Sequence, residues 1–125
     1  MLANSVVYSS FSTDRLLDSF LFYKEVLGLE AELVNDRFMH LRLPGDHLHV
    51  VYQKEDHQPA NHTVLNFQIT EIEKAVRHLQ KKGVKFLQYE KPIETDERGI
   101  SWDDNGSHLA WFKDPGGNIL ALIEN

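Results

Sequence analysis

The C-terminal stretch WFKDPGGNILALIEN, residues 111–125, contains two short apolar runs on either side of a turn. Its Asp-Pro pair is typical of the start of a turn, and the two glycines that follow can adopt a positive φ. Each run has the length of a strand, so the stretch predicts a β-hairpin. Alternation in the last strand, Ile119–Ile123, puts Leu120 and Leu122 on one face and Ala121 at the centre of the other. Both faces of this strand are apolar and must be covered.

The composition fits one compact domain. The chain has 125 residues, of which 42% are hydrophobic and 26% are charged, so it is long enough to bury a core. It contains no cysteine, which excludes disulfides, thiolate metal sites and a cysteine nucleophile. The N-terminal residues lack the basic and apolar regions of a secretion signal, and no apolar run is long enough to span a membrane. We therefore expect a cytoplasmic protein without a membrane partner.

The charge balance argues against nucleic acid as a partner. The chain has 13 Lys and Arg residues against 19 Asp and Glu residues, which gives a formal net charge of -6. Such a surface repels phosphate backbones, and the sequence has no basic patch with interleaved aromatic residues.

The first half of the chain has the pattern β-α-β-β-β. Its first predicted strand is Asn4–Phe11, and Thr13 or Asp14 is predicted to cap a helix that ends at Gly28. Three further strands are predicted at Glu30–Val34, Arg37–Leu43 and His47–Gln53.

The second half repeats this pattern. His62–Ile69 alternates between polar and apolar residues as a strand does, and Thr70 and Glu73 have the spacing of a capping box for a helix that ends at Gly83. The remaining segments are a predicted strand at Val84–Glu90, a polar loop at Lys91–Ser107 and the C-terminal hairpin.

The degenerate repeat predicts an α+β fold. We expect two βαβββ modules, about residues 1–56 and 60–125, within a single domain that comprises residues 1–125. Each four-stranded sheet would place one face on its helix and leave the other free to line a cleft. Clefts between pseudo-symmetric halves are common ligand sites, so the repeat favours a small-molecule function.

Two segments resemble a known family. FLFYKEVLGLE, residues 20–30, and KDPGGNILALIE, residues 113–124, resemble the most recognisable segments of the glyoxalase/bleomycin-resistance/extradiol-dioxygenase group, the vicinal oxygen chelate superfamily. The resemblance covers nearly the whole chain. It implies two βαβββ modules that form an open, barrel-like sheet around a cleft, with the helices outside, commonly in a homodimer. Members include metal-dependent lyases, isomerases and dioxygenases as well as metal-free proteins that sequester drugs, so the fold leaves function open.

The resemblance also places four metal-ligand positions. Metal-dependent members hold one divalent ion with one side chain from the first and one from the last strand of each module, mostly His and Glu. Here these positions fall on Tyr8, His49, Val64 and Ala121. A divalent ion needs three or four donors, and only His49 is a usual ligand. We expect no metal and no other cofactor; the alternative is a divalent metal bound through His49.

The histidines leave a displaced metal site as a second alternative. His47 and His49 share a face at i, i+2, and His62 or His108 would have to complete such a site. Hydrogen bonding of these side chains in a wet cavity is the simpler interpretation. His49 is also the candidate for a general base, although without a metal it lacks an electrophilic partner.

The residues on the inner faces of the predicted strands are the candidates for contact with a ligand. Ser10 is one of them. Trp102, in the polar loop, is interpreted either as a lid over the cleft or as a dimer contact. The acidic residues of that loop form either a solvated rim or a mouth that attracts a cationic ligand. The predicted ligand-binding residues are Tyr8, His49, Val64, Asn66, Gln68, Trp102 and Ala121.

The sequence therefore predicts a metal-independent protein that binds a small organic molecule in the cleft between its modules. The first alternative is a metal-dependent lyase, isomerase or dioxygenase of the same superfamily, and the second is a non-catalytic regulatory or structural dimer. We favour a protein without enzymatic activity; if it is an enzyme, we expect a glyoxalase-type lyase or isomerase or a dioxygenase. A homodimer is expected because the apolar last strand and the short open sheets leave surface to cover.

Overall fold

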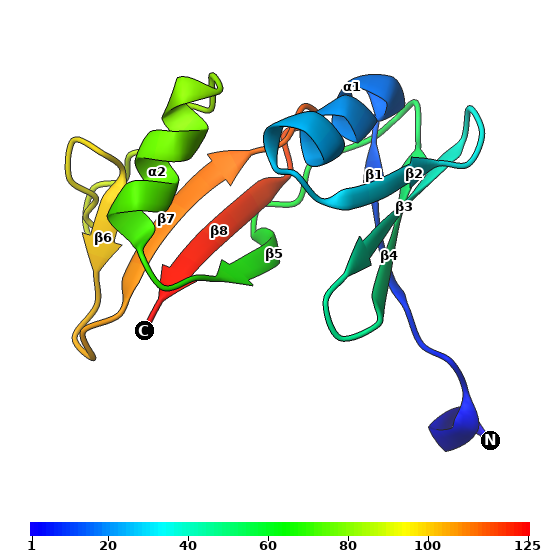
Figure 1. Ribbon diagram of the computed structural model, residues 1–125, viewed down its shortest axis with the longest axis horizontal. Coiled ribbons are helices and arrows are strands. Elements are labelled where there is room, and N and C mark those ends of the chain that lie inside the picture. Colours follow the sequence, from blue (N-terminus) through cyan, green and yellow to red (C-terminus); the bar gives the residue numbers. More distant parts are fainter. The chain divides into compact units, whose positions relative to one another are not determined.

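The computed structural model describes residues 1–125 and contains two four-stranded sheets and two α-helices. The chain divides into two compact units, Met1–Gln58 and Pro59–Asn125, and each unit has the order β-α-β-β-β (Figure 1). Neither sheet closes into a barrel. The predicted α+β class with a repeated βαβββ module is confirmed. None of the helices has the length and apolar character needed to cross a membrane.

The first unit contains a sheet with the strand order β1-β4-β3-β2. β1 and β4 are parallel, whereas β4, β3 and β2 are antiparallel to one another in turn. A short 3-10 turn, Leu2–Asn4, precedes β1, and one π-helical turn, Phe22–Val26, continues α1. The other elements of this unit are β1 (Ser9–Thr13), α1 (Leu16–Leu21), β2 (Glu30–Leu33), β3 (Phe38–Leu43) and β4 (His47–Gln53).

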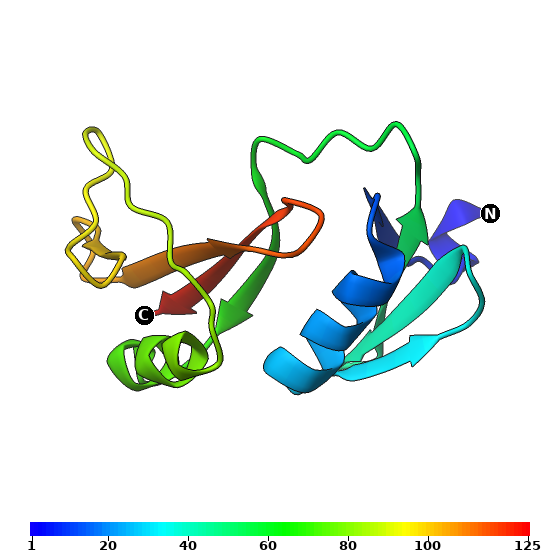
Figure 2. The same cartoon turned by 90° about the horizontal axis from the view of Figure 1, so that it is seen from above.

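The core of the first unit lies between α1 and one face of the sheet (Figure 2). Tyr23 of the π-helical turn is fully buried, and its ring meets that of Phe11 edge-on with the centroids 6.3 Å apart. Met39, Leu41 and Val51 are also fully buried, and Met39 and Val51 are paired across β3 and β4. Alternation from these residues therefore identifies the helix-facing side of each strand.

The first strand begins later than predicted. The prediction was Asn4–Phe11, but the parallel ladder with β4 starts at Ser9, which pairs with His49. The residues before Ser9 have strand propensity but pair with no neighbouring strand, so they stay outside the sheet. Tyr8 is one of them, and it is 59% exposed.

The second unit contains a sheet with the strand order β5-β8-β7-β6, in which β5 and β8 are parallel. α2 lies across one face of this sheet, with Ile72, Val76 and Leu79 as its buried stripe (Figure 1). Phe112 and Leu120, paired across β7 and β8 and fully buried, are on the same side. The elements of this unit are β5 (Thr63–Gln68), α2 (Ile72–Lys81), β6 (Ile100–Trp102), β7 (His108–Lys113) and β8 (Ile119–Glu124).

In both units, the first backbone N–H of the helix donates a hydrogen bond to a side chain at the end of the last strand. The Oε1 atom of Gln53 accepts a bond of 3.0 Å from the backbone N–H of Leu16, at the start of α1. The Oε1 atom of Glu124 accepts a bond of 2.7 Å from the backbone N–H of Ile72, at the start of α2. The two units thus use the same device to join helix and sheet.

The predicted helix caps are wrong. Neither helix has a side-chain hydrogen bond from its N-cap residue, and the expected capping box of Thr70 and Glu73 does not form. Thr13 accepts a bond from the backbone N–H of Arg15, one residue before α1. The helix N-termini are satisfied instead by distant side chains, because the last strand of each unit ends beside the helix start.

Loss of the Gln53 cap is expected to destabilise the protein. The substitution Gln53→Ala should lower the free energy of unfolding by about 1 kcal/mol, because the N–H of Leu16 loses its acceptor. Urea denaturation measures this difference, with Gln68→Ala, at an exposed position of β5, as the matched control that changes little. Equal losses in the two variants would contradict the capping role of Gln53.

The third strand of the second unit is not where the sequence placed it. Val84–Glu90 was predicted as a strand, but it forms only an isolated bridge between Phe86 and Phe112 and a hydrogen bond from Leu87 to Trp111. The actual strand, β6, lies within the segment predicted as a polar loop.

The turn before β6 explains how this polar segment returns to the sheet. The carboxylate of Asp96 accepts hydrogen bonds from the backbone N–H groups of Arg98 and Ile100, at 2.8 and 3.0 Å. Burial alone would raise the pKa of Asp96, but these bonds and the Arg98 guanidinium outweigh it and lower the pKa. Gly99 has φ +84°, and a Cβ there would lie 2.7 Å from Cβ of Phe86, so the turn requires glycine.

Candidate functional site

The candidate functional site is the face of the second sheet that does not carry α2, which we name the open face. Asn66 pairs with Ala121, and Ala121 pairs with Trp111, so the three side chains point to the same side. Leu120 and Leu122 alternate with Ala121 and point to the helix side, as the hairpin sequence predicted. By the same register the open face also includes Thr63, Gln68, Ser101, Leu109, Lys113, Ile119 and Ile123.

Ala121 lies at the centre of this open face. It is only 1% exposed, whereas Asn66 beside it on β5 is exposed and Trp111 on the other side is partly exposed. Its methyl group offers no atom that could bind a metal ion or a proton. The centre of the open face is therefore apolar, with an amide on one side and an indole on the other.

An aromatic pair borders the open face. The rings of Tyr89 and Trp111 meet edge-to-face with their centroids 5.3 Å apart. Tyr89 belongs to the loop after α2, and this loop extends on the side of the sheet away from α2 (Figure 2). Thr95 holds the loop, because its Oγ1 accepts a hydrogen bond of 2.8 Å from the backbone N–H of Tyr89. The open face is thus bounded on one side by fixed aromatic groups.

Val64 lies at an irregularity of β5. Thr63 pairs with Ile119 and Leu65 pairs with Leu120, so Val64 is the extra residue of a bulge. It is partly buried. The simple alternation predicted for this strand holds from Leu65 onward but does not assign Val64 to a face.

The orientation predicted for His49 is wrong. His49 pairs with Leu41, which is fully buried on the α1 side of the first sheet, so His49 points to that side as well. The residue on the opposite face is Val50, which pairs with Ser10 and with His40. Because apolar residues occupy both faces of β4, the sequence pattern did not fix its register, and the prediction slipped by one residue. Ser10 is on the predicted face.

The surroundings of His49 favour its neutral form. Desolvation by burial lowers the pKa of His49, and the nearby His47 on the same face lowers it further. A lowered pKa means that the folded protein takes up this proton less readily than the unfolded chain does.

The stability of the protein should therefore depend on the protonation of His49. As the pH falls through about 6.5, the unfolded chain binds the proton first, and the contribution of this residue to stability is progressively lost. The substitution His49→Gln should reduce the loss of stability between about pH 7 and pH 5. Urea denaturation between about pH 7 and pH 5 measures this loss. The control is His62→Gln, because His62 is exposed. An unchanged pH profile in His49→Gln would contradict the burial of His49.

The sequence did not reveal a polar pair on the first sheet. Ser12 lies on the same face as Val50, and its Oγ is 2.6 Å from Nδ1 of His57, which is 8% exposed. The two residues are 45 positions apart, and no local pattern links them. They add a hydroxyl and an imidazole to the face opposite α1.

The predicted histidines are not brought together. His62 lies before β5, and His108 bonds through Nδ1 to Glu124 at 2.9 Å on the α2 side of the second sheet. Trp102 pairs with His108 in register, so it also lies on the α2 side and not on the open face. No three His, Asp or Glu side chains are close enough to one another to hold a metal ion.

The residues at the four positions that the resemblance marks for metal ligands do not fit a metal site. Ala121 has no donor atom, and Val64 has none either. Tyr8 precedes the first strand, and the register places Val50 rather than His49 on the face where a ligand would be needed. A divalent ion requires three or four nitrogen or oxygen donors, and this set does not supply them.

A comparison with protein families agrees with the architecture. A sequence model of the Glyoxalase/Bleomycin resistance protein/Dioxygenase superfamily matches residues 6–122. The chain belongs to this superfamily. No curated protein sequence matches the chain significantly.

Several solved structures have the same fold. A glyoxalase/bleomycin resistance protein/dioxygenase superfamily member from Sphaerobacter thermophilus has a TM-score of 0.74 and 22% identity, over 98% of this chain and 99% of that chain. A lactoylglutathione lyase from Agrobacterium tumefaciens has a TM-score of 0.69 and 17% identity, over 97% and 94% of the two chains. A virulence protein from Salmonella typhimurium has a TM-score of 0.63 and 19% identity, over 99% and 98%. At these identities the likeness shows the fold and not the activity.

Proposed function

We propose that this superfamily member binds a small organic molecule on the open face of its second sheet, without a divalent metal ion. The observation that supports the proposal most directly is Ala121, which lies between Asn66 and Trp111 where the resemblance expects a carboxylate. A methyl group cannot coordinate a metal, and it makes the centre of the open face apolar, as the lining of ligand sites usually is.

The other residues of the open face suit a neutral, partly aromatic ligand. Trp111 offers an indole for stacking, and Ile119 and Ile123 extend the apolar surface. The amides of Asn66 and Gln68, both exposed on β5, supply donors and acceptors that can orient the ligand. Ligand sites typically combine a mostly apolar lining with a few polar groups of this kind.

We infer binding rather than catalysis. A metal-dependent lyase, isomerase or dioxygenase needs several metal donors, which the four marked positions do not provide. General-base catalysis by His49 has no support, because His49 points to the α1 side of its sheet. We therefore do not infer lyase activity for this chain from its similarity to the lyase from Agrobacterium tumefaciens.

We also propose that the protein is a cytoplasmic homodimer. The absence of cysteine suits a reducing compartment. The turn between β2 and β3 exposes Leu33, Val34 and Phe38, which are 38 to 45% accessible in the single chain, and a second copy would cover them. Light scattering should give the mass of a dimer for the natural sequence and of a monomer for the double substitution Leu33→Ser and Phe38→Ser. A monomer mass for both would contradict this arrangement.

The binding proposal is tested with a panel of neutral aromatic fragments such as indole and naphthol. In the variant Trp102→Phe, Trp111 is the remaining one of the two tryptophans, so its fluorescence reports on the open face. A binding fragment at about 100 times its Kd should also add about 2.7 kcal/mol to the free energy of unfolding. Asn66→Ala should weaken binding, whereas Asn105→Ala, an exposed asparagine in the turn after β6, should not. Failure of every fragment in both measurements would favour a regulatory or structural dimer.

The metal-free part of the proposal has its own test. The protein is dialysed against Zn²⁺, Ni²⁺, Mn²⁺ or Fe²⁺, and the retained metal is measured. We expect no stoichiometric retention. One equivalent of metal that is retained by the natural sequence and lost in His49→Gln would overturn the proposal and favour the metal-dependent alternative.

A further inference from the structure

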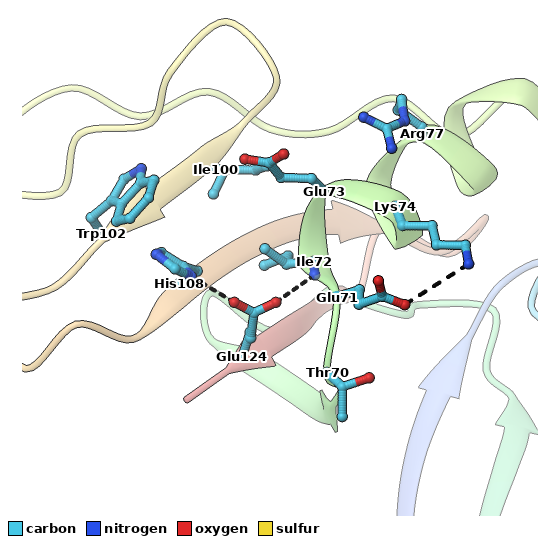
Figure 3. A pocket seen from close by; sticks show the side chains of 10 residues that line it. All are labelled: Thr70, Glu71, Ile72, Glu73, Lys74, Arg77, Ile100, Trp102, His108 and Glu124. Atoms are coloured by element: carbon cyan, nitrogen blue, oxygen red, sulfur yellow. Dashed lines mark hydrogen bonds and ion pairs between the residues drawn. The ribbon is translucent and has the colours of Figure 1, made fainter.

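A pocket of about 300 Å³ lies on the α2 side of the second sheet, opposite the open face. It is formed by the first turns of α2 and by the ends of β6, β7 and β8 (Figure 3). His108 pairs in register with both Trp102 and Glu124, so the three side chains point to the same side. All three line the pocket.

Glu124 fixes the position and the tautomer of His108. Its Oε1 accepts the N–H of Ile72 at 2.7 Å, and its Oε2 lies 2.9 Å from Nδ1 of His108 (Figure 3). The bond from Ile72 and then the bond from His108 lower the pKa of Glu124, so the carboxylate is ionised and accepts both bonds. Nδ1 of His108 therefore carries a proton, and in the neutral ring Nε2 is an acceptor.

The Nε2 atom of His108 has no hydrogen-bond partner although it is buried. A buried polar atom without a partner is unusual in a folded protein and costs stability. The backbone N–H of Ile72, at the start of α2, is not its partner, because that N–H donates to Glu124. The fold of the protein gives no reason for this buried Nε2 atom to lack a donor.

Trp102 covers His108. The indole and imidazole rings are nearly perpendicular, at 82°, with their centroids 3.8 Å apart. Trp102 is nevertheless 63% exposed, which is unusual for the largest apolar side chain. A ligand that turned the indole away from His108 would gain access to Nε2 and an aromatic face to stack on. Asp103 and Asp104 follow Trp102 directly and add negative charge beside it.

The charges around the pocket have a small negative excess. Arg98 bonds to Glu73 at 2.9 Å and to Asp96 at 2.7 Å, so two carboxylates share one guanidinium. Glu124 adds a third carboxylate, and Arg77, which has no acidic partner within 4.0 Å, adds a second guanidinium. The remaining lining pair, Glu71 with Lys74 at 3.8 Å, is balanced. Three carboxylates thus stand against two guanidinium groups.

We propose that this pocket binds a small organic cation with N–H donors, such as a primary ammonium group attached to an aromatic ring. The ammonium group donates to Nε2 of His108 and lies against the indole of Trp102, which attracts cations through its ring face. The acidic surroundings favour the same charge. The volume of the pocket is at the lower end of the range for ligand sites, which limits the ligand to about one ring. The proposal does not depend on ligand binding at the open face.

The test is calorimetric titration of the whole chain at neutral pH with three probes of similar shape. Benzylamine is the cation, benzyl alcohol is neutral, and benzoate is the anion that Arg77 would prefer. We expect saturable binding of benzylamine, roughly tenfold weaker binding of benzyl alcohol, and no binding of benzoate.

Two substitutions locate the binding. Trp102→Leu and His108→Leu should each weaken benzylamine binding by roughly tenfold, whereas Gln80→Ala, at an exposed position of α2 outside the pocket, should leave it unchanged. Because Trp102 is largely exposed, its substitution keeps the test valid if His108→Leu does not fold. Equal affinities for benzylamine and benzyl alcohol, preference for benzoate, no binding of benzylamine, or full binding by Trp102→Leu would each overturn the proposal.

Discussion

The substitution Ala121→Glu is expected to lower the free energy of unfolding by about 3 kcal/mol, because it buries a carboxylate without a cationic partner. Ala121 is 1% exposed and lies between Asn66 and Trp111, neither of which carries a positive charge. Protonation of the introduced carboxylate removes part of this cost, so we expect the pKa of the glutamate at position 121 to be raised. Urea denaturation at several pH values measures both effects, and the destabilisation should shrink as the pH falls.

The matched control is Asn66→Asp. Asn66 pairs with Ala121 on the same face but is exposed, so a carboxylate there keeps its water. This variant should differ from the natural sequence by about 0.5 kcal/mol or less. A harmless Ala121→Glu would show that Ala121 does not face the apolar centre of the open face, and that the register of β8 is wrong.

The substitution Phe112→Ala should cost more than any other single change considered for this protein, about 3–5 kcal/mol. Phe112 is fully buried on the α2 side, and its ring meets Phe86 at a centroid distance of 5.4 Å. Removing the ring leaves a cavity beside Leu120, its partner in β8. Thermal and urea denaturation measure the loss.

The neighbouring residue provides the control for this second prediction. Trp111 has a larger side chain than Phe112 but lies on the open face and is only partly buried. Trp111→Ala should therefore cost clearly less than Phe112→Ala, although more atoms are removed. The opposite order would mean that the two faces of β7 have been exchanged.

The C-terminal hairpin and the repeated module could be predicted because their signals are local. Turn residues fix where β7 and β8 meet, and the alternation of Leu120, Ala121 and Leu122 assigns them to faces. Asn66 and Gln68 were placed for the same reason, since Leu65 alternates with them. What these residues bind stays a prediction.

The parts that were missed depend on contacts between distant residues. β6 forms because Asp96 and Gly99 turn a polar segment back onto β7, which no periodicity indicates. The helix caps come from Gln53 and Glu124, which are 37 and 52 positions away from the N–H groups that they bind. Propensity and local spacing do not contain this information.

The orientation of His49 was missed for another reason. β4 has apolar residues on both faces, so a shift of one residue leaves its pattern equally acceptable. The register became clear only from the pairing of His49 with Leu41 and from the hydrogen bond of Gln53 to α1. The corrected orientation removes the one usual metal ligand from the predicted set and weakens the metal-dependent alternative.

The measurement that tests the central claim most directly is a proton–nitrogen NMR titration with neutral aromatic fragments in the presence of EDTA. We expect a binding fragment to shift the NMR signals of the backbone amides of Asn66, Trp111 and Ala121 and of the side-chain amides of Asn66 and Gln68. These shifts should saturate without any added metal. Shifts that appear only after a divalent metal replaces EDTA, or that leave these amides unchanged, would contradict metal-independent binding at the open face.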